Sequence, residues 1–470
     1  MQTITRDDVA LPPPDVLSRF DIAGPRYTSY PTADRFVEAF DAAAYGNWLA
    51  GRDSTATGRP MSLYVHLPFC NTVCYYCGCN KVVTKDHGRA AEYLRALETE
   101  IELVSERLAG SRKVEQLHFG GGTPTFLSSD ELCQVMLTLE KRFDLGGGRA
   151  ENREFSIEID PRTCDADKVR VLADIGFNRM SVGVQDFDPA VQKAVNRLQG
   201  FDTTQATIDA ARGGGFKSIN VDLIYGLPKQ SRTTFARTLD KVLVLSPDRI
   251  ALYQYAHLPE RFKPQRRILV GDLPSPEERL GIMYDAIARL TAAGYRYIGM
   301  DHFAKGSDDL ARAQSQGRLH RNFQGYSTRP DCDLIALGVS AISKIGPTYA
   351  QNARELSEYY DRLRNRMLPV VRGVLLDLDD LARRAVIMAL MCHFEVSKEA
   401  IETAHLIDFD SYFRREVAGL ADLEEAGLVE VNHEWITVTP KGKLVVRAIA
   451  MRFDRYLKLD QRLRAYSRVV

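Results

Sequence analysis

The sequence lacks three features that would place it in a specialised class. Its 62 lysine and arginine residues are balanced by 62 aspartate and glutamate residues, so the chain has no formal net charge. A nucleic-acid-binding or membrane-surface protein would carry a basic excess, so this balance argues against both classes, although a local basic patch remains compatible with it. No apolar run is long enough to cross a bilayer, and the first residues lack the basic flank and apolar segment of a signal peptide.

A disulfide framework is also missing. Four of the eight cysteines, Cys133, Cys164, Cys332 and Cys392, are scattered along the chain in unremarkable contexts. This usage is typical of proteins in a reducing compartment, so we expect a cytoplasmic protein. At 470 residues the chain is too long for one ordinary core, which predicts a large α/β domain with one or two smaller pieces.

The other four cysteines lie within ten residues, CNTVCYYCGC at 70–79, directly after the apolar run 63–67. The run predicts a strand, with the cysteines on the loop that leaves its C-terminal end. A C-x3-C-x2-C loop cannot form a set of good mutual disulfides, but such loops hold iron–sulfur clusters. If Cys70, Cys74 and Cys77 bind a four-iron cluster, one iron has no protein ligand and can bind a small molecule. Zinc is the alternative, but zinc sites usually use two separated cysteine pairs and no second pair exists here.

From Met61 onward, short apolar segments alternate with longer segments of helical periodicity. Six strands separated by helices require parallel pairing with right-handed crossovers. A complete eight-stranded barrel would need two more such units. The sequence therefore predicts an α/β fold with a partial (β/α)6 barrel, whose strands are expected at 62–67, 115–119, 155–159, 179–184, 218–224 and 249–255.

We expect the barrel, with an extension for the substrate site, to occupy residues 61–370. Residues 1–60 form an N-terminal arm whose proline-rich and irregular composition fits either a surface segment or a lid over a site. Residues 371–470 are expected to be mainly helical, with helices at 381–392, 412–426 and 441–453 and a hairpin at 428–440. That order resembles a winged helix, and we interpret it as a structural or lid domain.

Every predicted barrel strand is followed by polar or glycine-rich residues. Each signal is weak alone, because a triple glycine is usually a tight turn and a terminal aspartate is usually a helix cap. Parallel α/β folds, however, build their sites at the C-terminal ends of the strands. One ligand crossing the six strand ends would meet all of these residues.

The pattern Cys70-x3-Cys74-x-Tyr76-Cys77 resembles the signature of the radical S-adenosylmethionine enzymes. A more specific resemblance is to the oxygen-independent coproporphyrinogen III oxidases (dehydrogenases) of haem biosynthesis. It is carried by PRYTSYPT, YVHLPFC, CYYCGCNK, GGGTPT, GVQDF, DLIYGLPKQ, YAHLP, GMDHFA, LHRNFQGY and GVSAIS, in this order between residues 25 and 343.

This resemblance implies that Cys70, Cys74 and Cys77 bind a [4Fe-4S] cluster. It also implies two bound S-adenosylmethionine molecules. Their expected contacts are Tyr64, Tyr76, Gly121, Gly122, Thr123, Glu158, Gln185, Arg197, Asp222, Ala256 and Ile342.

The implied reaction is the anaerobic oxidative decarboxylation of two propionates of coproporphyrinogen III to vinyl groups by a 5′-deoxyadenosyl radical, giving protoporphyrinogen IX. An unidentified reductant such as a flavodoxin or ferredoxin would supply electrons, and we expect a monomer. Because the substrate carries four carboxylates, cations should surround it. The candidates are Arg26, His257, Arg267, His302, His320 and Arg321.

The alternative from the same superfamily is a haem chaperone, with a methyltransferase as a more distant candidate. Cys79 separates the first two, because chaperone-type relatives resemble C-x3-C-x2-C-x-Phe and lack this fourth cysteine. They also lack the PRYTSYPT arm and the HRNFQGY loop. We therefore favour the enzyme and regard Cys79 as a candidate catalytic residue of undefined role.

Overall fold

The computed structural model describes residues 9–52, 59–146, 153–329, 332–457 and 466–469. Internal contacts divide the chain into two compact units. The larger unit comprises Phe36–Ala286 and Asp331–Leu375, and the smaller unit comprises Met1–Arg35, Ile287–Pro330 and Leu376–Val470. Among the helices of the described ranges, none has the length and apolar character that a bilayer crossing needs.

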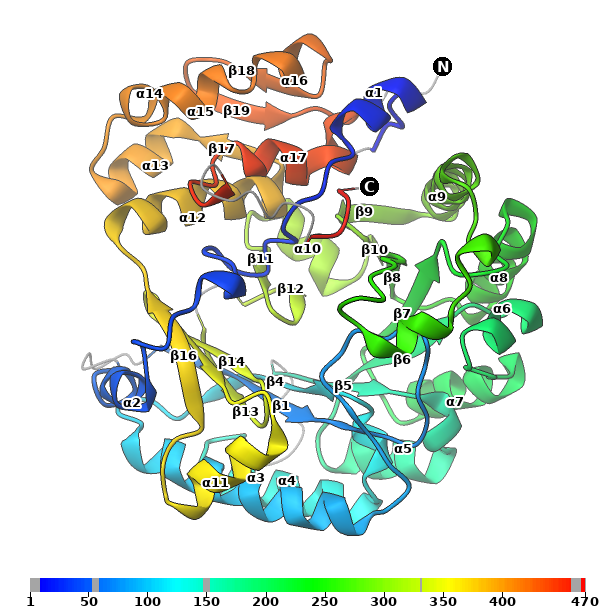
Figure 1. Ribbon diagram of the computed structural model, residues 1–470, viewed down its shortest axis with the longest axis vertical. Coiled ribbons are helices and arrows are strands. Elements are labelled where there is room, and N and C mark those ends of the chain that lie inside the picture. The colour runs from blue at the N-terminus through cyan, green and yellow to red at the C-terminus, as the bar shows by residue number, and fades with distance from the viewer. Residues whose placement is uncertain (1–8, 53–58, 147–152, 330–331, 458–465, 470) are drawn as a thin grey trace. The chain divides into compact units, whose positions relative to one another are not determined.

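Six parallel strands form the centre of the larger unit (Figure 1). They pair in chain order, and register partners such as Val65, Phe119, Ile157 and Met180 are buried along the row. This arrangement confirms the predicted partial (β/α)6 barrel. The strands are β1 (Met61–Leu67), β4 (Val114–Gly121), β5 (Glu154–Ile159), β6 (Arg179–Gln185), β7 (Ser218–Tyr225) and β8 (Arg249–Gln254).

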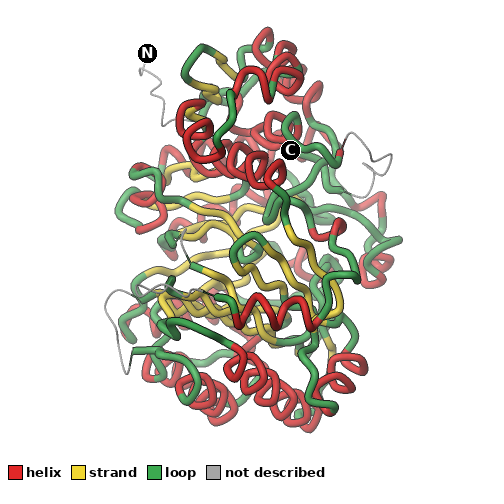
Figure 2. Tube along the Cα trace, turned by 90° about the vertical axis from the view of Figure 1, so that its left-hand side faces the viewer, coloured by secondary structure: helices red, strands yellow, loops and turns green. Residues whose placement is uncertain are grey.

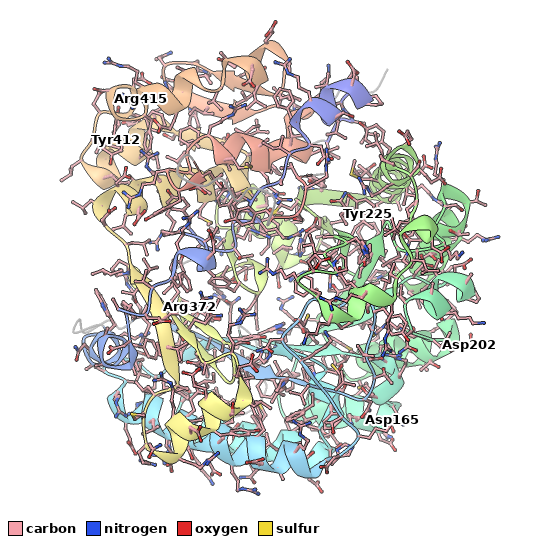
Figure 3. All side chains as sticks on the ribbon, in the orientation of Figure 1. Asp165, Asp202, Tyr225, Arg372, Tyr412 and Arg415 are labelled. Atoms are coloured by element: carbon pink, nitrogen blue, oxygen red, sulfur yellow. The ribbon has the colours of Figure 1, made fainter. Side chains whose placement is uncertain are left out.

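The helices between these strands lie along one face of the sheet, and Figure 2 shows them as a red layer beside the yellow strands. Four of them begin at a side-chain cap: for example, Ser128 and Glu131 form a capping box at α4, and the Asp165 side chain (labelled in Figure 3) accepts from Lys168 N at α5. The crossover helices are α3 (Gly88–Arg107), α4 (Ser129–Glu140), α5 (Ala166–Asp174), α6 (Pro189–Ala194), α7 (Phe201–Gly213) and α8 (Arg232–Leu245).

The sheet of the larger unit continues beyond β1 with four strands that the sequence did not predict as strands. β13 (Asp333–Leu337) pairs parallel with β1, and β14 (Ile342–Ile345), β15 (Thr348–Asn352) and β16 (Val370–Leu375) follow in antiparallel order. These strands have only four to six residues each and carry little periodicity, so the sequence did not identify them. α11 (Leu356–Arg364) packs against α3.

The smaller unit combines the first part of the N-terminal arm, up to Arg35, with a middle segment that begins at Ile287, within α9 (Pro276–Ala292), and with the C-terminal residues. Its elements before the C-terminal part are α1 (Pro14–Phe20), the hairpins β9 (Tyr295–Gly299) with β10 (His302–Lys305) and β11 (His320–Asn322) with β12 (Gly325–Ser327), and α10 (Asp309–Ser315).

The C-terminal part of the smaller unit has helices and a three-stranded antiparallel sheet, as a winged-helix-like arrangement requires. One expectation was wrong: the single helix expected at 412–426 is three short helices, interrupted near Phe413 and Gly419. Its elements are α12 (Leu378–His393), α13 (Lys398–His405), α14 (Phe409–Tyr412), α15 (Arg414–Ala418), α16 (Ala421–Glu425), α17 (Val446–Met451), β17 (Glu395–Ser397), β18 (Val429–Val431) and β19 (Trp435–Val438).

The arm is ordered by contacts within the smaller unit. The buried Arg447 guanidinium donates to the carbonyls of Gly24 and Pro25, the latter at 2.9 Å. The Tyr27 hydroxyl donates to Asp454 Oδ2 at 3.1 Å, and Arg26 forms an ion pair with Asp301. The irregular composition of the arm therefore encodes specific contacts with residues far along the chain.

The contact-based units do not follow the expected boundaries. Residues 36–52 of the predicted arm group with the larger unit, and residues 287–330 of the predicted barrel segment group with the C-terminal residues. Whether the segments 1–60, 61–370 and 371–470 behave as separate domains stays a prediction.

Candidate cluster and cofactor site

The cysteine loop is closed at its base by a short parallel pair, β2 (Phe69–Cys70) and β3 (Val82–Val83). Val82 N donates to Pro68 O at 2.7 Å, and Thr84 N donates to Cys70 O at 3.0 Å. These bonds hold both ends of the loop against the end of β1. The loop between them is short and fixed, which suits a segment that must present several sulfur atoms together.

All four cysteines of this loop are thiols, with Cys70, Cys74 and Cys77 half-buried and Cys79 exposed. Polar groups approach the sulfurs: Thr123 Oγ1 lies 3.5 Å from Cys70 Sγ, and Arg197 Nη1 donates to Cys74 Sγ at 3.7 Å. The hydrogen bond from Cys79 lowers the pKa of the Cys77 thiol to about 6. Such donors stabilise thiolates and tune the reduction potential of a bound cluster.

The donor set fits a cluster better than a single ion. Within the described ranges, no three His, Cys, Asp or Glu side chains are arranged to hold one metal ion. A four-iron cube takes each thiolate on a different iron, so its ligands surround a volume and need not converge on a point. The three half-buried cysteines, with hydrogen-bond donors beside two of the sulfurs, could serve as three such ligands.

Arg197 links the loop to the barrel. It forms a buried ion pair with Asp160 (Nη1–Oδ2 3.0 Å) and donates to Gly183 O at 2.6 Å, while also reaching Cys74. Arg162 pairs with the same carboxylate at 2.6 Å and approaches Cys74 Sγ at 4.0 Å. Two guanidinium groups thus place positive charge beside this sulfur. Although burial raises the pKa of Asp160, these cations lower it below its ordinary value.

Glu158 has a partly exposed carboxylate near the end of β5. Its side chain is 45 % exposed although β5 is a central strand. His118 Nε2 donates to Oε1 at 3.2 Å, and Gly121 N donates to Oε2 at 3.3 Å. Burial raises the pKa of Glu158, but these hydrogen bonds bring it below its ordinary value. Glu158 is therefore an ionised acceptor at neutral pH.

Asp222 and Gln185 lie on the next strands. Ser181 Oγ and Asn220 Nδ2 donate to Asp222 at 2.9 and 2.8 Å, and burial together with the charge of Glu158 raises the pKa of Asp222 to about 6. Gln185 ends β6 with φ 69°. Its side-chain amide nitrogen lies close to Gly183, where an added Cβ would be only 3.1 Å away. These contacts gather polar groups from β5, β6 and β7 at one end of the sheet.

Gly121 and Gly122 let the turn after β4 pack closely against β1 and the residues that follow it. Gly121 has φ +119°, and a Cβ there would lie 2.9 Å from the His66 ring. A Cβ at Gly122 would lie 2.5 Å from Pro68 O. Gly122 N and Thr123 N donate to Leu67 O and Phe69 O, so this turn is hydrogen-bonded to the base of the cysteine loop. Contact of these residues with a ligand stays a prediction.

The remaining predicted residues lie around this centre. Tyr64 stacks on His118 at 5.8 Å, and the Tyr76 and Ala256 carbonyls both accept from Gln265 Nε2, at 3.0 and 3.2 Å. Ile342 begins β14, two strands from β1 and away from the row that carries Glu158. The structure brings the cysteines, Thr123, Glu158 and Arg197 together, and it does not test the contact of Ile342 or Ala256 with a ligand.

Three residues of this region, His118, Arg162 and Ser181, were not predicted from the sequence. His118 and Glu158 lie on adjacent parallel strands, where His118 pairs in register with Ser156. Its position in the strand before the triple glycine was a usable signal, since alternate residues of a strand share a face. Arg162 follows Asp160 by two residues, but only the fold places its guanidinium beside Cys74.

The six cations expected to surround the substrate divide between the units. His257 and Arg267 belong to the larger unit, where the Tyr255 hydroxyl lies 2.9 Å from His257 Nδ1. In the smaller unit, Arg321 is buried, lies 4.7 Å over the Tyr326 ring and donates to Arg26 O. The His302 ring meets Tyr326 edge-on at 5.3 Å. Arg26, His302 and Arg321 therefore form one cluster around Tyr326.

Comparison with known proteins gives a consistent assignment. Residues 64–242 match the radical SAM superfamily, whose members use a [4Fe-4S] cluster and S-adenosylmethionine, and residues 376–445 match the HemN C-terminal domain. The oxygen-independent coproporphyrinogen III oxidase of Pseudomonas aeruginosa is 52% identical over 97% of this chain and 98% of that protein. The Escherichia coli K12 protein of the same name is 47% identical with the same coverage.

A solved structure agrees with the sequence relatives. Coproporphyrinogen III oxidase (HemN) from Escherichia coli, described as a radical SAM enzyme, superposes with a TM-score of 0.89 at 46% identity, covering 96% of this chain and 100% of that one. The architecture, the cysteine loop and the full-length similarity lead to one conclusion. The chain belongs to the oxygen-independent coproporphyrinogen III oxidase family of radical SAM enzymes.

Proposed function

We propose that this protein catalyses the oxidative decarboxylation of two propionates of coproporphyrinogen III to vinyl groups, giving protoporphyrinogen IX without oxygen. Full-length similarity to oxidases of that name supports the substrate. The observation that carries the chemistry is the cysteine loop, hydrogen-bonded at its base to the turn after β4 and joined through Arg197 to the end of β5. The same turn donates a hydrogen bond to Glu158 through Gly121 N, and this shared support favours a common site.

In this proposal Cys70, Cys74 and Cys77 hold the cluster. Once bound, the cluster and S-adenosylmethionine supply the electron and the radical that remove a hydrogen from the propionate side chain. Arg197 and Arg162 contribute positive charge beside Cys74, which offsets the negative charge of the thiolates. Asp160 keeps both guanidinium groups in place through short, buried ion pairs.

The polar groups at the strand ends would bind S-adenosylmethionine. Ionised Glu158 accepts hydrogen bonds and suits ribose hydroxyls, while Asp222, with its raised pKa, titrates closer to neutral pH. We assign the cofactor contacts, for two S-adenosylmethionine molecules, to Tyr64, Tyr76, Gly121, Gly122, Thr123, Glu158, Gln185, Arg197, Asp222, Ala256 and Ile342.

Cations would recognise the four carboxylates of the substrate. Arg321 and Arg26 are held on Tyr326 and Asp301, so their guanidinium groups are oriented before a substrate arrives. An arginine would bind one propionate through two parallel hydrogen bonds, and the histidines would bind the remaining carboxylates of the substrate. A one-electron donor such as a flavodoxin or ferredoxin, a monomeric state and a cytoplasmic location complete the proposal.

The test is anaerobic turnover of the reconstituted protein with dithionite, S-adenosylmethionine and coproporphyrinogen III. We expect protoporphyrinogen IX and two molecules of carbon dioxide per substrate. Cys70→Ser should abolish product, whereas Cys133→Ser, at a half-buried position on α4, should retain it. Stable haem binding by the wild-type protein without product would contradict the proposal and favour a haem chaperone.

A further inference from the structure

Two segments of the larger unit hold the cysteine loop from outside the barrel strands. Tyr75 N donates to Val195 O at 3.0 Å, and Asn196 Nδ2 donates to Val73 O at 2.8 Å, which attaches the turn after α6. The second segment follows β8 and contains the 3-10 helix η4 (Lys263–Arg267). In Figure 1 this green segment lies against the blue loop that follows β1.

The contacts of the second segment reach the residues between the cysteines. Gln265 Nε2 donates to Tyr76 O at 3.0 Å, and the Phe262 ring packs so closely on Gly78 that a Cβ there would lie 3.0 Å from it. Arg267 lies 5.1 Å over the Tyr75 ring and donates to its hydroxyl at 3.3 Å. The outer surface of this segment is therefore an outer surface of the cluster-binding region.

That surface is strongly cationic in a chain of zero net charge. Residues 260–267, ERFKPQRR, carry four cations against one anion, Glu260. Arg261, Lys263, Arg266 and Arg267 are all exposed. Among the residues that the structure describes, no carboxylate forms an ion pair with Lys263, Arg266 or Arg267. Their charge consequently acts on the solvent side and can attract an anionic partner.

Exposed apolar side chains lie in the same two segments. Leu198, directly after Arg197, is 66 % exposed, and Leu269 and Val270 are 68 % and 70 % exposed. Ile268 and Val195, their buried neighbours, pack in one small core with Tyr75 and Tyr76. The exposed apolar residues are therefore attached to a packed core that holds their backbone. A docking surface needs this support, whereas a face that is only solvated does not.

We propose that the docking patch, defined as Leu198, Arg261, Lys263, Arg266, Leu269 and Val270, receives an acidic, flavin-bearing one-electron carrier protein. The inference rests on the proposed function, which needs an external electron. Cations steer an acidic partner and fix its orientation, and the three apolar side chains form the centre of the interface. The patch lies on the segments that contact Tyr75 and Tyr76, so docking brings the carrier to the cluster-binding loop.

The transfer is balanced without any further reactant. The reduced carrier loses one electron and the cluster gains it, and no bond forms or breaks. Steering by surface charge raises association rates about 10- to 1,000-fold at low ionic strength and declines as salt is added. The reaction of the two proteins should therefore slow steeply with salt, whereas reduction by dithionite, an anion of small size, needs no docking surface.

The test uses the reconstituted full-length protein and reduced flavodoxin as the probe, with cluster reduction followed by stopped-flow absorbance. In Lys263→Glu/Arg266→Glu, we expect the second-order rate with flavodoxin to fall about tenfold or more at low salt and its salt dependence to flatten. The rate with dithionite should stay unchanged. The matched control Arg414→Glu/Arg415→Glu reverses two exposed cations on α15 of the smaller unit (Arg415 is labelled in Figure 3) and should behave as wild type.

A second variant, Leu269→Ser/Val270→Ser, should weaken flavodoxin binding while leaving the salt dependence as in wild type. Equal flavodoxin rates in the wild-type and charge-reversed proteins would overturn the proposal, as would an equal slowing with dithionite, because the segment would then only support the loop. Dithionite-driven turnover tests the proposed function separately. If no product forms with dithionite, the proposed function is refuted, and the rates of cluster reduction by flavodoxin still show whether the docking patch binds the carrier.

Discussion

At the scale of single residues, the site depends on charges placed around sulfur. Arg197 and Arg162 approach Cys74, and Asp160 pairs with both. The cysteines of the loop differ in burial: Cys79 is exposed, whereas Cys70, Cys74 and Cys77 are half-buried. The division of this loop into three cluster ligands, Cys70, Cys74 and Cys77, and one additional thiol, Cys79, stays a prediction.

The first prediction concerns that division. Cys70→Ser should lose the cluster, so the iron content of the reconstituted protein should fall from about four per chain to near zero. Cys79→Ser should retain about four irons, because we assign the cluster to the other three cysteines. Iron and sulfide analysis of the two variants measures this, with Cys133→Ser as the control. Loss of iron in Cys79→Ser would make it a ligand and refute the assignment.

The second prediction concerns Arg197→Gln. The substitution removes a charged donor to Cys74 and one of two cations on buried Asp160, so we expect the free energy of unfolding to fall by about 2–3 kcal/mol. The reduction potential of the bound cluster should also become more negative, because a hydrogen bond to sulfur is lost. Urea unfolding and a redox titration measure these effects. Arg170→Gln, which breaks an exposed pair with Asp167, should change stability by less than about 0.5 kcal/mol.

At the scale of elements, α3 joins the parallel row to its antiparallel extension. Glu100 on α3 accepts from Gly338 N at 2.7 Å, from Asn352 Nδ2 at 2.6 Å and from the Tyr359 hydroxyl at 2.6 Å. These donors follow β13, end β15 and lie on α11, respectively. One buried carboxyl group therefore connects four elements that are up to 259 residues apart in the chain.

This group should make stability depend on pH. Burial raises the pKa of Glu100 to about 7 against an ordinary value of 4.5. A raised carboxyl pKa means that the folded state holds the proton more tightly, so its contribution is complete below about pH 4.5 and is lost as pH rises through 7. The loss amounts to about 3 kcal/mol at about 1.4 kcal/mol per pKa unit.

Glu100→Gln keeps a neutral side chain of the same shape and should remove this part of the pH dependence between pH 4.5 and 7. Urea unfolding at a series of pH values measures it. Glu98→Gln, on an exposed position of the same helix, is the matched control and should follow the wild-type curve. Parallel curves for wild type and Glu100→Gln would contradict the prediction.

At the scale of the whole chain, the two ends are fastened to each other within the smaller unit. Buried Arg447 donates to the carbonyls of Gly24 and Pro25 and also to those of Ser467 and Arg468. Burial and the charge of Arg26 lower the pKa of Arg447 to about 9. The chain thus uses one costly buried cation to satisfy backbone groups of both terminal segments.

Arg447→Met should leave these carbonyls without a donor and lower the free energy of unfolding by about 3 kcal/mol or more. The arm should also become accessible, so limited trypsin digestion should cleave after Arg26 faster than in wild type. Differential scanning calorimetry and mass spectrometry of the digest measure both effects. The control Arg452→Met loses only a half-exposed ion pair with Asp422, so it should change the free energy of unfolding by about 1 kcal/mol or less. Equal stability and equal digestion of the two variants would refute the role of Arg447.

The sequence by itself determined the six barrel strands, the cysteine loop and the family, because buried parallel strands are continuous apolar runs and cluster ligands are close in sequence. Only the tertiary structure decided how distant residues meet: Arg162 beside Cys74, Glu100 beneath β13 and β15, and Arg447 on the N-terminal arm. It also revealed the four strands beyond β1 and the breaks in 412–426, because short segments carry too little periodicity. Ligands and strands made of adjacent residues can be recognised in the sequence. Contacts between residues that are hundreds of positions apart depend on burial and hydrogen bonding, which only the folded chain provides.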